Sequence, residues 1–142
     1  MALSALDNLV RTGGLKSEAP EQGEIDGLIR SGLARLADAS VNALSLDGRF
    51  DLAYNAAHAL SLAALRWHGY RSENRYLVFQ TLAHTLALPP EQWRLLDTAH
   101  RKRNVVEYEG VADVDEEIVA ALIRVTREVA ARVQRLGPVA KG

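Results

Sequence analysis

Apolar residues recur every three or four positions along most of this chain, which is the spacing of amphipathic helices. The first such helix is predicted between residues 24 and 44, and its apolar stripe consists of Ile25, Leu28, Ile29, Leu33, Leu36, Val41 and Leu44. A second helix is predicted from an N-cap at Ser45 to Trp67, with Gly69 as a left-handed stop. Because alanines recur along it, neighbouring backbones can approach closely, and we expect this helix to be central and buried on several sides.

Three further helices are predicted in the second half of the chain. A shorter one, capped by Ser72 or Asn74, continues to Leu86, and Pro90 opens a long one that ends at Gly110. The last begins at Asp113 or Asp115, carries an apolar seam to Leu136 and stops at Gly137-Pro138. No convincing strand signal is present. About five helices with short connections predict an all-α fold, an antiparallel up-and-down bundle.

The ends of the chain differ from this bundle, which we assign to residues 21–137. Residues 1–20 form a predicted N-terminal arm, with a short amphipathic piece before Gly13-Gly14, and residues 138–142 form a C-terminal tail. The apolar residues of the arm are Leu3, Leu6, Leu9 and Val10. The arm is expected to be mobile, to cover an exposed end of the same chain, or to dock on a second subunit.

Composition narrows the class of protein without naming a function. The chain has 142 residues, 48% hydrophobic and 25% charged, as in an ordinary globular domain. The absence of cysteine excludes disulfides, zinc ribbons and thiol nucleophiles, and it fits the reducing cytoplasm. The opening residues resemble neither a signal peptide nor a membrane span, so no membrane partner is expected. The histidines never pair at i, i+4, and there is neither a Gly-rich phosphate loop nor a Gly-x-Ser-x-Gly elbow, so no metal or cofactor is predicted.

Positive charge is concentrated in the middle of the chain, although the net charge is only −1. The two basic groups are Arg66, His68, Arg71 and Arg75, then Arg94, His100, Arg101, Lys102 and Arg103. If they face one another they form a phosphate-binding patch; the alternative is solvated helix faces whose charges pair with nearby acids. His58, among alanines on the central helix, is expected to be a core histidine with its hydrogen bonds satisfied, or a partly buried one, rather than a catalytic one.

Arg103 lies on the apolar stripe of its helix, in phase with Leu96, Ala99 and Val106, so its stem is expected to be partly buried. A carboxylate from Glu107 or Asp51 would then be its partner, and such a salt bridge can be purely structural. Asn104 and Tyr108 lie one turn apart on the same helix. The motif residues Arg103, Asn104, Glu107 and Tyr108 thus place a guanidinium, an amide, a carboxylate and a phenol where they can hold a phosphate or a base.

The segments Phe50-Asp51-Leu52-Ala53-Tyr54-Asn55-Ala56-Ala57-His58 and His100-Arg101-Lys102-Arg103-Asn104-Val105-Val106-Glu107-Tyr108-Glu109-Gly110 resemble the HEPN family, and the likeness covers about residues 24–136. The resemblance implies a helical bundle that forms homodimers and is often found with a minimal nucleotidyltransferase partner. It implies further that nuclease members carry an Arg-x4–6-His motif, with a polar residue often directly after the arginine. Arg103 and Asn104 match its first half, whereas Tyr108 stands at the position of the histidine.

This departure changes the expected activity. In the mechanism that the resemblance implies, RNA is cut without metal: the 2′-hydroxyl attacks the phosphate, histidine moves a proton and arginine stabilises charge. A phenol with a pKa of about 10 is a poor proton acceptor at neutral pH, although it can bind a phosphate or stack on a nucleobase. His100, three residues before Arg103, is the nearby imidazole that could replace it as the proton acceptor.

The leading hypothesis is therefore a non-catalytic or weakly catalytic HEPN-like homodimer that binds nucleotide or RNA. Its binding residues are His100, Arg101, Lys102, Arg103, Asn104, Glu107 and Tyr108. There are two alternatives. The first is a metal-independent endoribonuclease that acts as the toxin of a toxin–antitoxin pair, with Arg103 and Tyr108 as its catalytic residues. The second is a protein–protein adaptor.

Overall fold

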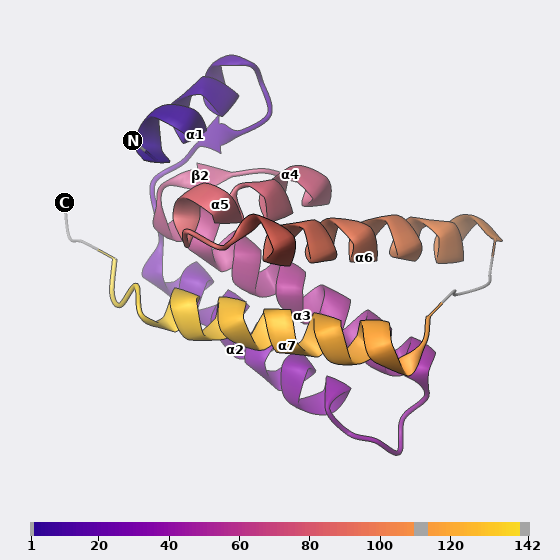
Figure 1. Ribbon diagram of the computed structural model, residues 1–142. Coiled ribbons are helices and arrows are strands. Elements are labelled where there is room, and N and C mark those ends of the chain that lie inside the picture. The colour runs from indigo at the N-terminus through magenta and orange to yellow at the C-terminus, as the bar shows by residue number, and fades with distance from the viewer. Residues whose placement is uncertain (1, 110–113, 140–142) are drawn as a thin grey trace.

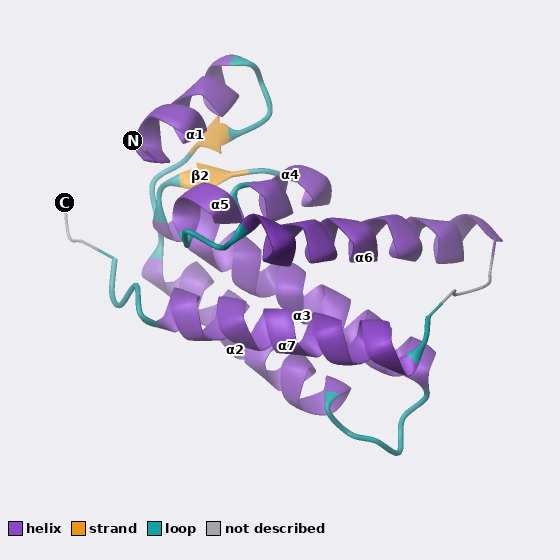
Figure 2. Cartoon of the chain, viewed as in Figure 1, coloured by secondary structure: helices purple, strands orange, loops and turns teal. Residues whose placement is uncertain are grey.

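The computed structural model describes the backbone of residues 2–109 and 114–139 and the side chains of residues 4–104 and 114–139. Helices dominate it, as Figures 1 and 2 show. The elements in chain order are α1 (Ala2–Arg11), β1 (Lys16–Ser17), α2 (Gln22–Ala39), α3 (Leu46–Trp67), β2 (Tyr70–Arg71), α4 (Arg75–Gln80), α5 (Leu82–Thr85), α6 (Pro90–Glu109) and α7 (Glu116–Gln134). The predicted all-α helical bundle is confirmed.

Helix α3 is the centre of the bundle, as its alanines predicted. It packs against α2, α7, α4 and α6, and the chain direction alternates from α2 to α3 and from α6 to α7 (Figure 1). The alanines on α3 that the packing buries are Ala53, Ala56, Ala57, Ala59, Ala63 and Ala64. Small side chains let the helices approach closely, and at the α2–α3 contact Gly32 is buried against Leu60.

The capping predictions are confirmed at three helix starts. Ser45 Oγ accepts from Gly48 N at 3.0 Å, Asn74 Oδ1 from Leu77 N at 3.2 Å, and Asp115 Oδ1 from Ile118 N at 2.9 Å. Each bond satisfies a backbone donor that the first helical turn leaves without a partner. Gly69 and Gly137 adopt φ of 92° and 72°, the left-handed conformation expected for helix stops.

Two predicted helices differ from the structure. Helix α2 ends at Ala39, and the loop that follows carries Val41 and Leu44 into solvent, so their assignment to the buried stripe was wrong. The helix predicted to end at Leu86 is divided into α4 and α5 at Thr81. There the Thr81 hydroxyl donates to the carbonyl of Val78 at 2.7 Å, a local side-chain bond of the kind that competes with a continuing helix.

The N-terminal arm covers one end of the bundle in the same chain. Leu6 and Leu15 are buried in a small cluster with Leu65, Tyr70 and Val78. The arm also pairs with the segment after α3: β1 and β2 are antiparallel, a short ladder that the sequence did not reveal. The described arm is therefore packed, as in the second of the three alternatives for it.

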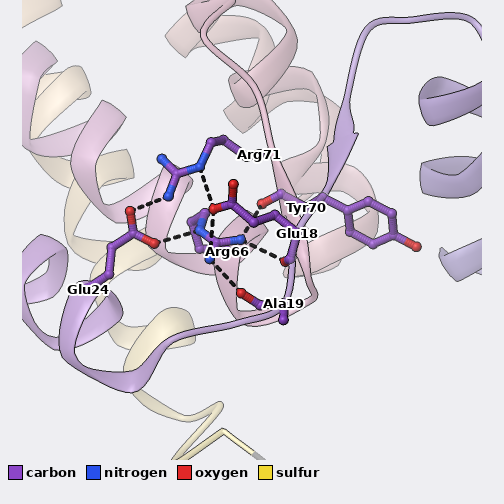
Figure 3. Close-up of polar contacts among 6 residues, drawn as sticks. All are labelled: Glu18, Ala19, Glu24, Arg66, Tyr70 and Arg71. Carbon is purple, nitrogen blue, oxygen red and sulfur yellow. Dashed lines mark hydrogen bonds and ion pairs between the residues drawn. The ribbon is translucent and has the colours of Figure 1, made fainter.

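A buried arginine on α3 binds both the end of the arm and the first turn of α2 (Figure 3). Arg66 is 1% exposed; its Nε donates to Glu24 Oε1 at 2.6 Å, and Nη2 lies 3.3 Å from Glu18 Oε2. Its remaining donors reach the carbonyl oxygens of Glu18, Ala19 and Tyr70. Arg71, which is more exposed than Arg66, binds the same two carboxylates. Both guanidinium groups lower the pKa of Glu24, and Arg66 has the larger effect.

Within the described residues, no helix has both the length and the apolar character needed to cross a membrane.

Candidate functional site

A polar network lies where α3, α4 and α6 meet, away from the Arg66 cluster. Its centre is Tyr54, a residue of α3 that is 2% exposed, whose hydroxyl lies 2.9 Å from Nδ1 of His100 on α6. The imidazole Nε2 lies 3.3 Å from the side-chain amide nitrogen of Asn104, one turn further along α6. The donor and acceptor roles of the two ring nitrogens depend on the tautomer of His100: with the Asn104 amide nitrogen as the donor, Nε2 accepts and the proton of a neutral imidazole lies on Nδ1, facing the Tyr54 oxygen.

Arg103 extends this network toward the surface. Its Nη1 bonds Asp51 Oδ1 at 2.7 Å, and its guanidinium carbon lies 5.6 Å from the centroid of the Tyr54 ring. The side chain is 26% exposed, so the predicted partly buried stem is confirmed. Asp51, one of the two candidate carboxylates, lies beside it, and the side chain of Glu107, the other, lies outside the described residues. An arginine over a tyrosine ring gains a cation–π interaction as well as an ion pair.

A second arginine approaches the same ring from α4. The guanidinium carbon of Arg75 is also 5.6 Å from the Tyr54 centroid, so the two guanidinium carbons are at most twice that distance apart. Arg75 Nη1 donates to Asn55 Oδ1 at 3.2 Å, and the Asn55 amide donates to the backbone oxygen of Asp51. Among the described residues no carboxylate lies within ion-pair distance of Arg75. The site therefore contains two cations close to one described carboxylate.

His58 lies one turn beyond Tyr54 on α3, its ring edge-on to Phe79 with 6.1 Å between centroids. Burial has the largest effect on the pKa of His58, followed by the coulombic effects of Arg75 and then His100, and together they lower this pKa to about 4. The imidazole is therefore neutral at pH 7. Its Nε2 is buried without a hydrogen-bond partner among the described residues, so His58 is a partly buried core histidine, as expected, but one whose polar atom is not satisfied.

The structure brings together some of the predicted binding residues and separates others. His100, Arg103 and Asn104 belong to the network just described. Arg101 is exposed and bonds Thr98 on its own helix at 3.4 Å, whereas Lys102 lines a hollow between α6 and α7 that also contains Asp115 and Glu117. The side chains of Glu107 and Tyr108 lie outside the described residues, so the second half of the predicted motif stays a prediction.

The two basic groups are not one continuous patch. Arg66 and Arg71 pair with Glu18 and Glu24, so the pairing with nearby acids stated as the alternative is present, but Arg66 is buried and does not lie on a solvated helix face. Only Arg75 of the first group joins Arg103 of the second beside the Tyr54 ring.

The sequence contained a signal for the α3 side of the site. Asp51, Tyr54, Asn55 and His58 recur at intervals of three and four residues on a helix otherwise rich in alanine, so their polar atoms share one face. On α4, Arg75 belongs to the first basic group that was considered as facing the second, whereas Tyr76 had no such signal, because only the tertiary fold brings it next to His100 of α6.

Comparisons of the chain with family models, with curated proteins and with solved structures found no match. The resemblance to the HEPN family therefore stays a prediction from the residues quoted for it.

Chemically, the arrangement suits the binding of an anion beside an aromatic ring. Two guanidinium groups supply planar sets of donors that match phosphate oxygens, and the Asn104 amide and the His100 imidazole lie beside them. A groove of about 720 Å³ near Trp67, at the opposite end of α3, contains none of these residues.

Proposed function

We propose that this protein is a HEPN-like helical-bundle protein of the cytoplasm that binds nucleotide or RNA through the surface formed by α3, α4 and α6. The observation that carries the proposal is Arg75, a partly buried residue whose guanidinium packs on the same Tyr54 ring as that of Arg103 and which has no described carboxylate partner. A cation held in this way favours a phosphate ligand, because the phosphate supplies a negative charge that none of the described carboxylates places at Arg75.

The proposal gives the protein a binding role and little or no catalysis. Both ring nitrogens of His100 are engaged, with Tyr54 and Asn104, which leaves this imidazole poorly placed to take a proton from a 2′-hydroxyl. The resemblance to HEPN proteins adds a homodimer, in which a two-fold axis would bring two copies of the site together, and a minimal nucleotidyltransferase protein as a partner.

The second candidate is a metal-independent endoribonuclease, and the position of His100 next to Arg103 favours it. An imidazole within one turn of an arginine is the minimum for proton transfer together with charge stabilisation. The third candidate, a protein–protein adaptor, is favoured by the Arg103–Asp51 ion pair if that pair only stabilises the bundle.

One experiment separates the three candidates. A labelled single-stranded RNA pool is incubated in EDTA with wild type, Arg103→Ala and Tyr108→His, and both cleavage and retention of the RNA are measured. Arg124→Ala, which removes an exposed arginine on α7, is the matched control. We expect binding without cleavage by wild type, binding weakened by about 10-fold in Arg103→Ala, and an affinity that falls steeply with salt.

The other outcomes select the other candidates. Cleavage by wild type that Arg103→Ala abolishes makes the protein a ribonuclease. Absence of RNA and nucleotide binding at low salt, together with a lower melting temperature for Arg103→Ala, makes the arginine a structural residue of an adaptor.

A further inference from the structure

An aromatic ring lies exposed at the edge of the candidate site. Tyr76 on α4 is 41% exposed, although most large apolar side chains of the described bundle are buried. Its ring centroid is 6.3 Å from that of His100, which is itself 6.2 Å from the Tyr54 ring. Tyr76 therefore continues, toward solvent, a row of rings that begins in the core at Tyr54.

Arg75 precedes Tyr76 in the chain and belongs to the same surface. Its guanidinium is held over Tyr54 and by Asn55, so its donors are fixed before any ligand arrives. A fixed cation binds a phosphate with less loss of side-chain entropy than a freely rotating surface arginine does. The surface thus presents an ordered guanidinium and an exposed aromatic face from consecutive residues.

An unpaired nucleotide has the two chemical groups that this surface would accept. A phosphate matches the guanidinium fork, and a base matches the face of a tyrosine ring. In a duplex the base faces are already occupied by stacking, so only a single strand or a free nucleotide can present one to a protein ring.

We propose that Arg75 and Tyr76 form a subsite for one unpaired nucleotide, with the phosphate on Arg75 next to Arg103 and the base stacked on Tyr76. The proposal rests on the function proposed above and adds the chemical form of the ligand: an unstacked nucleotide, in a single strand or free. It predicts preference for single strands over duplexes and tolerance of base identity, because every base has a face to stack.

The test uses fluorescence polarisation of a labelled oligouridylate with the full chain. The competitors are a duplex RNA, uridine monophosphate and inorganic polyphosphate. The variants are Tyr76→Ala, Tyr76→Phe, Arg75→Met and Arg103→Ala. Leu44→Ala, which truncates another exposed apolar side chain, in the loop between α2 and α3, is the control. Circular dichroism confirms that each variant is folded.

We expect Tyr76→Ala to weaken oligouridylate binding by about 10- to 100-fold, and Tyr76→Phe to restore it. Polyphosphate, which has no base, should compete equally well in wild type and Tyr76→Ala, whereas Arg75→Met should weaken both ligands. Competition by uridine monophosphate at concentrations similar to those of the oligomer would identify a free nucleotide as the ligand, and competition by the oligomer alone would identify a strand.

The result that overturns the inference is oligouridylate binding that Arg103→Ala weakens and Tyr76→Ala leaves unchanged, or equal affinity for duplex and single strand. In that case the proposed function survives without this subsite. If wild type binds neither oligomer nor mononucleotide, the proposed function and the subsite fail together.

Discussion

Replacing the buried Arg66 by methionine should destabilise the protein by about 3 kcal/mol. Methionine fills much of the same volume but removes the donors that hold Glu18, Glu24 and three backbone carbonyl oxygens. Breaking a buried ion pair from one side costs about 3–5 kcal/mol, because the partners stay behind. The lower end applies here, since Glu24 keeps Arg71 as a partner and the exposed Glu18 can turn to water.

The measurement is urea unfolding followed by circular dichroism. With a slope of about 2 kcal/mol per molar urea, the loss moves the midpoint of Arg66→Met down by roughly 1.5 M. Arg71→Met is the control: this residue is 31% exposed and binds the same carboxylates, so its loss should cost about 1 kcal/mol. The Arg66 effect should be similar at low and high salt, because the buried pair is poorly screened.

Two results would refute this reasoning. A urea midpoint for Arg66→Met equal to that of wild type would mean that the cost of desolvating the buried guanidinium is as large as the stabilisation from its hydrogen bonds and ion pairs. Equal losses in Arg66→Met and Arg71→Met would mean that burial does not distinguish the two arginines.

Two further predictions concern α2 and α3. Gly32→Ala should lower the free energy of unfolding by about 1–2 kcal/mol, because the added Cβ would lie 2.6 Å from Leu60 Cγ. Gly27→Ala, whose added Cβ would have no atom within 4 Å, should raise the free energy of unfolding by about 0.5–1 kcal/mol. Equal effects of the two substitutions in urea unfolding would contradict this account. The pKa of His58 is lowered to about 4 in the folded protein, so between pH 6.5 and 4 His58 takes up a proton when the protein unfolds. The contribution of neutral His58 to the free energy of unfolding is therefore fully present above pH 6.5, and up to about 3 kcal/mol of it is lost as the pH drops from 6.5 to 4. His58→Leu should flatten that part of the curve, leaving the slope from His68, whose pKa burial also lowers, and an unchanged slope would contradict the assignment.

The features that the sequence predicted correctly are those that short stretches of chain determine. The caps at Ser45, Asn74 and Asp115 depend on a side chain and an amide three residues away, and the burial of α3 follows from its alanines. The partly buried position of Arg103 follows in the same way from its phase on the helix.

The features that the sequence did not predict depend on contacts between distant segments. From the sequence alone Arg66 could be a surface cation, and only the fold brings Glu18 of the arm and Glu24 of α2 into contact with it. Arg75 likewise gains its place beside Arg103 only when α4 packs on α6. Neither the periodicity of a helix nor the spacing of a motif contains that information.

The most direct test of the central claim is to map where RNA contacts the protein. The full chain is photo-crosslinked to a single-stranded RNA containing 4-thiouridine, digested, and analysed by mass spectrometry. We expect crosslinks at Tyr76 and along the neighbouring turns of α6 around His100, reduced by Arg75→Met and Arg103→Ala. Crosslinks concentrated at the Trp67 groove or on α7, with the Tyr76 peptide unmodified, would contradict the assignment of this surface as the binding site.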